Sequence, residues 1–237
     1  MQIYTARMQS WNFHLQQDYS HIENGIQIWL LHQKDCPLTE RELALFSQEE
    51  LLAAERFHSP EVKAQYLKGH LLIKRMLAHC SNSPEQQVQL QKEEHGKLCW
   101  NFPLHFNLSH SGEWIVAAFS FLSEIGIDIE CRKRTPRMES IVRHFFHPDE
   151  IETWCSTSDT EQKTLFFQYW TMKEALLKAT GDGLYASTKD FCLKPKTHSA
   201  TIWYADHVNH QYDSWLLETF PTPEDYTGSV AYRVRKN

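Results

Sequence analysis

Apolar residues recur at helical spacing in two long stretches of the chain. Residues 61–80 follow a proline at the entry position, and their apolar residues share one helical face. That face is made of Tyr66, Leu67, Leu71, Leu72, Met76 and Leu77. Residues 160–180 carry a second apolar stripe and stop at Gly181, which suits the left-handed position after a helix. Both stretches are predicted to be helices packed on a core.

Two shorter stretches also predict helix. Within residues 38–58, Thr39 and Glu42 have the spacing of a capping box, and a break is expected near Ser47. Residues 141–155 are helical in character but are interrupted by Pro148.

Strands are predicted where apolar and polar residues alternate. Residues 104–121 read as strand, turn and strand, with the polar turn at 109–112. Residues 124–130 follow closely, so the three strands are expected to form an antiparallel meander. The tail predicts four further strands within residues 190–235, and no internal repeat is visible by direct comparison.

The composition is that of a soluble globular protein, with 41% apolar and 23% charged residues. A chain of 237 residues allows one large domain or two of about 120 residues. Six cysteines without a C-x-x-C pair predict reduced thiols. The start lacks a secretory pattern and no stretch approaches the ~18 apolar residues of a membrane span, so we expect a cytoplasmic protein without membrane contact.

Net charge of −6 argues against nucleic acid as a partner. One local exception is the run 131–137, which contains Arg132, Lys133, Arg134 and Arg137. Such a run could face an anionic ligand or an acidic protein, although charge alone favours an ordinary solvated loop.

The sequence GIDIE, residues 126–130, places Asp128 and Glu130 on one side of a strand, because alternate side chains share a face. Two carboxylates at this spacing suit a hard divalent cation such as Mg²⁺, but they also suit a solvent-facing strand. On the helix at 160–180, Glu174 and Lys178 lie four residues apart. They could form an exposed salt bridge, or serve as a metal ligand or base and as a phosphate-binding charge.

The turn at 107–112 offers Ser109 and His110, which suit a ligand-binding loop better than a catalytic dyad. The sequence has no P-loop, no G-x-G-x-x-G and no H-E-x-x-H.

Taken in order, NLSHSG, GIDIE, FHPDE and WTMKEALLKATGDGL resemble the motifs of the 4′-phosphopantetheinyl transferases, of the surfactin-synthetase-activating type. The resemblance covers residues 107–184 and extends weakly back to the helix at 61–80. It implies an α+β fold of two similar halves related by a pseudo-twofold. We expect an N-terminal half at 1–112 on the nucleotide side of coenzyme A, and a C-terminal half at 113–237 carrying the metal and catalytic motifs.

The resemblance also implies roles for individual residues. Metal ligands are expected at Asp128, Glu130 and Glu174, and catalytic roles at Glu174 and Lys178. Coenzyme A contacts are expected at Lys97, Ser109, His110, Asp128, Lys173 and Lys178. Glu150 matches a further acid near the site, with a secondary role. The basic residues Arg132, Lys133, Arg134 and Arg137 become a candidate carrier-docking patch, with Arg143 beside them.

The N-terminal half departs from the family pattern. Gln65 stands where a basic residue is usual, and Leu98 replaces the proline after G-K. Arg56, Lys63, Lys68 and Lys74 are the substitute candidates for contacts with the nucleotide.

The implied reaction moves the phosphopantetheine arm of coenzyme A, with Mg²⁺, onto a serine of an acidic, helical acyl or peptidyl carrier protein. Adenosine 3′,5′-bisphosphate is released, and a monomer suffices because one chain holds both halves. Two rivals remain at this point: a metal-dependent nucleotide pyrophosphohydrolase, and a non-catalytic carrier-binding module.

Overall fold

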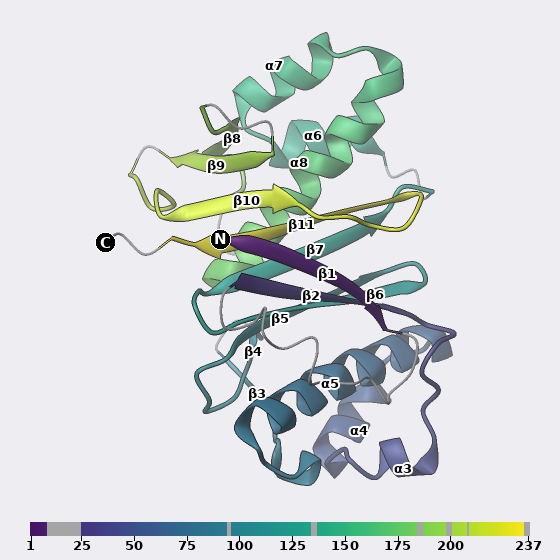
Figure 1. Ribbon diagram of the computed structural model, residues 1–237. Helices are drawn as coiled ribbons and strands as arrows, with labels where there is room; N and C mark the ends of the chain where they lie inside the picture. Colours follow the sequence, from purple (N-terminus) through teal and green to yellow (C-terminus); the bar gives the residue numbers. More distant parts are fainter. Residues whose placement is uncertain are drawn as a thin grey trace. The chain divides into compact units, whose positions relative to one another are not determined.

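The computed structural model divides the chain into two compact units, Met1–Leu122 and Ser123–Asn237. It describes residues 1–8, 25–93, 96–133, 137–183, 187–197, 201–207 and 209–234. Each unit combines helices with its own sheet, as expected for the α+β class (Figure 1). The boundary expected after residue 112 falls in a turn between two strands of one sheet.

The N-terminal unit is a four-stranded sheet with helices beside it. Its strands are β1 (Gln2–Met8), β2 (Gly25–His32), β5 (His105–Ser111) and β6 (Trp114–Ser120), in the order β1-β2-β6-β5. Only the β1–β2 pairing is parallel among these strands. The helices are α3 (Glu40–Leu43), α4 (Gln48–Ala54) and α5 (Pro60–Ser81). A short 3₁₀ turn η1 (Glu85–Gln87) and a hairpin of β3 (Gln91–Lys92) and β4 (Leu98–Cys99) follow α5.

The C-terminal unit is a five-stranded antiparallel sheet with the order β7-β11-β10-β9-β8. Its strands are β7 (Ile125–Cys131), β8 (Phe191–Pro195), β9 (Ile202–His207), β10 (Trp215–Thr219) and β11 (Tyr226–Arg233). Its helices are α6 (Met138–Phe145), α7 (Pro148–Ser156) and α8 (Asp159–Thr180), and α8 lies against β7, β10 and β11 (Figure 1).

The predicted helices are confirmed, and their ends follow local chemistry. The region 38–58 breaks at Ser47, which caps α4 in a capping box with Glu50. Pro148 begins α7 as its first residue, after the cap His147. Gly181 ends α8 with a φ of 80°. Among the described residues, none of the helices is long and apolar enough to cross a membrane, and the six cysteines are free.

The predicted three-strand meander is wrong. β5 and β6 form the expected hairpin, but β7 joins the sheet of the C-terminal unit, where it pairs with β11. Ser123 fixes this change of sheet, because its hydroxyl donates to the carbonyl oxygen of Arg233 at 2.6 Å and accepts from the Arg233 N–H at 2.8 Å.

The structure shows an internal repeat that direct sequence comparison missed. Residues 25–29 read GIQIW and residues 126–130 read GIDIE, and each segment pairs antiparallel with the last strand of its unit. The helices α4 and α7 begin within FSQE and FHPD, at the third residue of each, and each places a glutamate at the third helical position. The next helices, α5 and α8, each have 22 residues. Both units therefore use the same succession of strand, short helix, long helix and terminal hairpin.

Candidate active site

The close approach of α8 to β7 builds the site of the C-terminal unit. A side chain at Gly126 would overlap the carbonyl oxygen of Ala175 and the backbone nitrogen of Ala179, so only glycine allows this approach. Asp128, two residues along β7, is only 3% exposed. The Lys178 ammonium nitrogen lies 2.7 Å from its carboxylate. Lys178 on α8 therefore places its positive charge directly beside the buried Asp128.

Glu174 lies one helical turn before Lys178 and completes a cluster of carboxylates. Burial raises the pKa of Glu174, and the negative charges of Asp128 and Glu130 raise it further, while Lys178 lowers it. Asp128 and Glu130 therefore both lie near enough to Glu174 for their charges to act on its carboxyl group. We call Asp128, Glu130 and Glu174 the acid cluster.

Three carboxylates with one ammonium group carry excess negative charge in a half-buried place. Such a donor set fits a hard divalent cation, which takes oxygen ligands and keeps positions open for waters or phosphates. The repeat sharpens this assignment, because the N-terminal unit has no carboxylates at the matching positions. Gln27 and Trp29 take those places on β2, and Arg75 takes the place on α5. Only the C-terminal copy of the repeat offers this oxygen donor set.

Lys173 does not point to the acid cluster. Its ammonium nitrogen lies 2.9 Å from the Glu150 carboxylate and donates to the carbonyl oxygens of Thr188 and Phe191, at 2.7 and 3.1 Å. Its side chain is 1% exposed and that of Glu150 is fully buried. These contacts do not fit the expected role of Lys173 at coenzyme A, and they also give Glu150 a structural partner. The sequence motif did not distinguish the roles of the two lysines, because Lys173 precedes Glu174 and Lys178 follows it on the same helix.

In the N-terminal unit, Ser109 and His110 lie at the end of β5, with Ser109 buried and His110 exposed. The turn after them is held by two glutamine side chains. The amide nitrogens of Gln33 and Gln65 both donate to the carbonyl oxygen of Gly112, at 3.3 and 2.6 Å. Gln65, which departs from the basic residue usual in the family, therefore anchors this turn.

The structure also sorts the basic candidates of this unit. The ammonium groups of Lys68 and Lys74 are buried, the first donating to the carbonyl oxygens of Gln33 and Asp35 and the second bound to a glutamate carboxylate. Lys97 is half-buried beside the β3–β4 hairpin. Arg56 is exposed, and Lys63 is half-buried with its ammonium nitrogen 2.6 Å from the Glu55 carboxylate.

Comparisons with known proteins identify the family of the chain. The family model of the 4′-phosphopantetheinyl transferase superfamily matches residues 124–231, and that of the 4′-phosphopantetheinyl transferase N-terminal region matches residues 37–121. The transferase HetI of Nostoc sp. is 38% identical over 170 residues, which cover 69% of this chain and 71% of the relative. The chain belongs to the 4′-phosphopantetheinyl transferase superfamily. It is therefore a transferase enzyme.

Two further relatives are similar to this transferase over most of their length. The transferase gsp of Aneurinibacillus migulanus is 35% identical, covering 73% of this chain and 72% of the relative. Sfp of Bacillus subtilis is 29% identical, with 81% and 93% covered. A solved holo-[acyl-carrier-protein] synthase of Thermotoga maritima gives a TM-score of 0.39 at 14% identity, covering 48% of this chain and 66% of that one. Membership of the family rests on the sequence matches.

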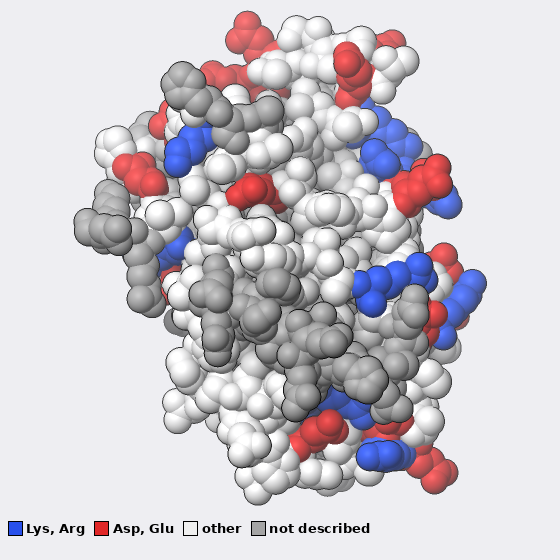
Figure 2. Space-filling model, in the orientation of Figure 1, with Lys and Arg blue, Asp and Glu red and all other residues white. Residues whose placement is uncertain are grey.

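The basic run of the transferase lies after β7. Lys133 is exposed, and its ammonium nitrogen lies 3.2 Å from a carboxylate oxygen of Asp225. Arg137 is exposed at the start of α6, and Arg132 is half-buried. Arg134 lies outside the described residues. On the face drawn in Figure 2, basic and acidic side chains of the described residues are interspersed rather than gathered into one large field.

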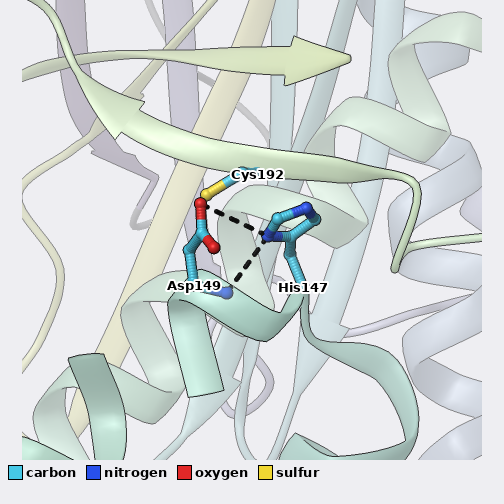
Figure 3. A group of neighbouring side chains, drawn as sticks. All are labelled: His147, Asp149 and Cys192. Carbon is cyan, nitrogen blue, oxygen red and sulfur yellow. Dashed lines mark hydrogen bonds and ion pairs between the residues drawn. The ribbon is translucent and has the colours of Figure 1, made fainter. Parts of the chain in front are cut away.

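A second group of side chains of metal-binding types lies at the N-terminal cap of α7. Ligand atoms of His147, Asp149 and Cys192 all lie within 4.8 Å of one another (Figure 3). However, the His147 Nδ1 atom accepts the Asp149 backbone N–H at 3.2 Å and caps α7. The positive end of the helix dipole disfavours a cation there, and burial raises the pKa of the Cys192 thiol to about 11.

Proposed function

We propose that this enzyme transfers the 4′-phosphopantetheine arm of coenzyme A to a serine hydroxyl of an apo acyl or peptidyl carrier protein. The observation that carries the proposal is the acid cluster beside β7, with Lys178 bound to Asp128 at 2.7 Å. Relatives named as 4′-phosphopantetheinyl transferases support the type of group transferred. The nucleophile comes from the carrier, so this chain needs no activated serine of its own.

In the proposed reaction, the serine oxygen forms a bond to the phosphorus that carries the pantetheine arm. The phosphoanhydride bond breaks, and adenosine 3′,5′-bisphosphate leaves with the electron pair of that bond. Asp128, Glu130 and Glu174 would hold Mg²⁺, which supplies positive charge at the pyrophosphate when bound. Ser109 and His110 would bind the 3′-phosphate, and Lys97 would contact coenzyme A.

Glu174 is the proposed base for the serine proton, directly or through a water molecule. Its burial raises its pKa, which makes it a better proton acceptor than an exposed glutamate. Binding a cation weakens the same carboxylate as a base. Lys178 would donate hydrogen bonds to the phosphate oxygens as negative charge develops on the leaving group.

Removing a carboxylate from the acid cluster tests the assignment. Asp128→Ala and Glu174→Ala should each lower the rate of carrier modification by about 10²–10³, the usual cost of losing one charge-stabilising group. Rates with coenzyme A, Mg²⁺ and an apo carrier measure this loss. Glu152→Ala, at an exposed position on α7, is the control and should keep the wild-type rate. Near-normal turnover of either cluster variant would refute the assignment.

We further propose that the basic residues after β7 dock the carrier, because carrier domains of this kind are acidic. Arg137→Glu should raise the KM for the carrier several-fold and leave the KM for coenzyme A unchanged, since charge reversal acts on encounter with an acidic partner. Steady-state kinetics against both substrates give the two constants. Equal carrier kinetics in the variant and the wild type would rule out this docking patch.

A further inference from the structure

Each unit contains a buried ion pair that the proposed chemistry does not use. Lys173 and Glu150 lie 2.9 Å apart with side chains 1% and 0% exposed, and Lys74 and Glu50 lie 2.8 Å apart with side chains 2% and 11% exposed. Burying an ion pair adds little net stability, because the cost of removing two charges from water offsets their attraction. The geometry that each pair imposes is a better reason for its presence.

The pair of the C-terminal unit connects three elements. Lys173, in the second half of α8, donates to the carbonyl oxygens of Thr188 and Phe191, the latter at the start of β8. Glu150, at the third position of α7, accepts the Leu193 N–H on β8 at 2.7 Å. The Lys173 ammonium group is therefore bound to Glu150, Thr188 and Phe191, and the side chain cannot change its conformation without breaking buried hydrogen bonds.

This anchoring acts on the residue next to it. Successive residues of an α-helix are about 100° apart around the axis, so fixing the direction of Lys173 also fixes that of Glu174. Glu174 then faces the same strand as Lys178, whose ammonium group reaches Asp128 on β7. A small rotation of α8 would move Glu174 relative to the two acids on the strand.

We propose that Glu150 and Lys173 are a positioning pair, which fixes the rotation of α8 and thereby sets the affinity of the acid cluster for a divalent cation. This inference rests on the proposed function, because it requires a cation at that cluster. Glu50 and Lys74 occupy the matching positions of the repeat, in a unit that lacks the cluster. They provide a control within the same chain.

Direct metal binding tests the proposal without relying on activity. Mn²⁺ takes the same oxygen ligands as Mg²⁺, and its free concentration in the presence of enzyme and coenzyme A can be read by electron paramagnetic resonance. Three variants are compared with the wild type: Glu150→Gln/Lys173→Met, the matched Glu50→Gln/Lys74→Met, and Glu174→Gln as a reference for the cluster.

We expect the C-terminal double variant to weaken Mn²⁺ binding at least tenfold, while the N-terminal double variant keeps the wild-type Kd within twofold. If the two double variants have the same Mn²⁺ affinity while Glu174→Gln has lost binding, the pair is purely structural and the inference is overturned. If Glu174→Gln itself binds Mn²⁺ as the wild type does, the proposed metal site is wrong.

A milder pair of variants keeps the test decisive if the double variants unfold. Glu150→Asp and its match Glu50→Asp keep the charge and shorten the side chain by one methylene. The first should weaken Mn²⁺ binding severalfold and the second should not, measured below the Tm of both. Equal affinities for these two variants would also overturn the inference.

Discussion

At the scale of single residues, two lysines on one helix differ in their burial and in their partners. Lys173 is enclosed by Glu150 and two carbonyl oxygens, whereas Lys178 is 31% exposed beside Asp128. Strand alternation was enough to predict that Asp128 and Glu130 share a face. It could not predict the partner of Lys173, because Glu150 and β8 reach that lysine only through the fold.

His70 on α5 gives a prediction about stability. It is 5% exposed, and burial lowers its pKa from 6.5 to about 4, although the bond between its Nδ1 and the Tyr66 carbonyl oxygen opposes this change. Between these two pH values the unfolded chain binds a proton at His70 that the folded chain does not bind. The free energy of unfolding should therefore fall, by up to about 3 kcal/mol, as the pH decreases from 6.5 to 4.

Denaturant unfolding of the wild type and of His70→Gln across this range isolates the contribution of His70. The variant should lose less stability than the wild type as the pH falls, because glutamine does not titrate. Parallel profiles for the two proteins would show that His70 is not the group responsible.

At the scale of elements, the helices were more predictable than the strands. The apolar stripes, Ser47 and Gly181 marked helices and their ends, and the structure has them there. The sheet to which β7 belongs could not be read from the sequence, because β7 pairs with β11, the last strand of the C-terminal unit. The sequence also could not show why residue 126 must be glycine. The reason is that α8 packs so closely on this position that a side chain would not fit.

At the scale of the whole molecule, the two copies of the repeat differ in the residues that form the acid cluster. Direct comparison of the halves missed the repeat because few residues match: GIQIW against GIDIE, and a glutamate and a lysine in equivalent helices. Gln27, Trp29 and Arg75 replace the acids in the N-terminal copy. Both copies of the repeat contain the buried ion pair, and the proposed cation ligands lie in the C-terminal copy.

The central claim is the transfer of phosphopantetheine to a carrier, and the mass of the carrier tests it most directly. An apo carrier protein incubated with the enzyme, coenzyme A and Mg²⁺ should gain the mass of one phosphopantetheine group, on the carrier serine, with stoichiometric release of adenosine 3′,5′-bisphosphate. Cleavage of coenzyme A with no change in the carrier would identify a pyrophosphohydrolase, and no reaction at all would leave a binding module. Either of these results would contradict the account.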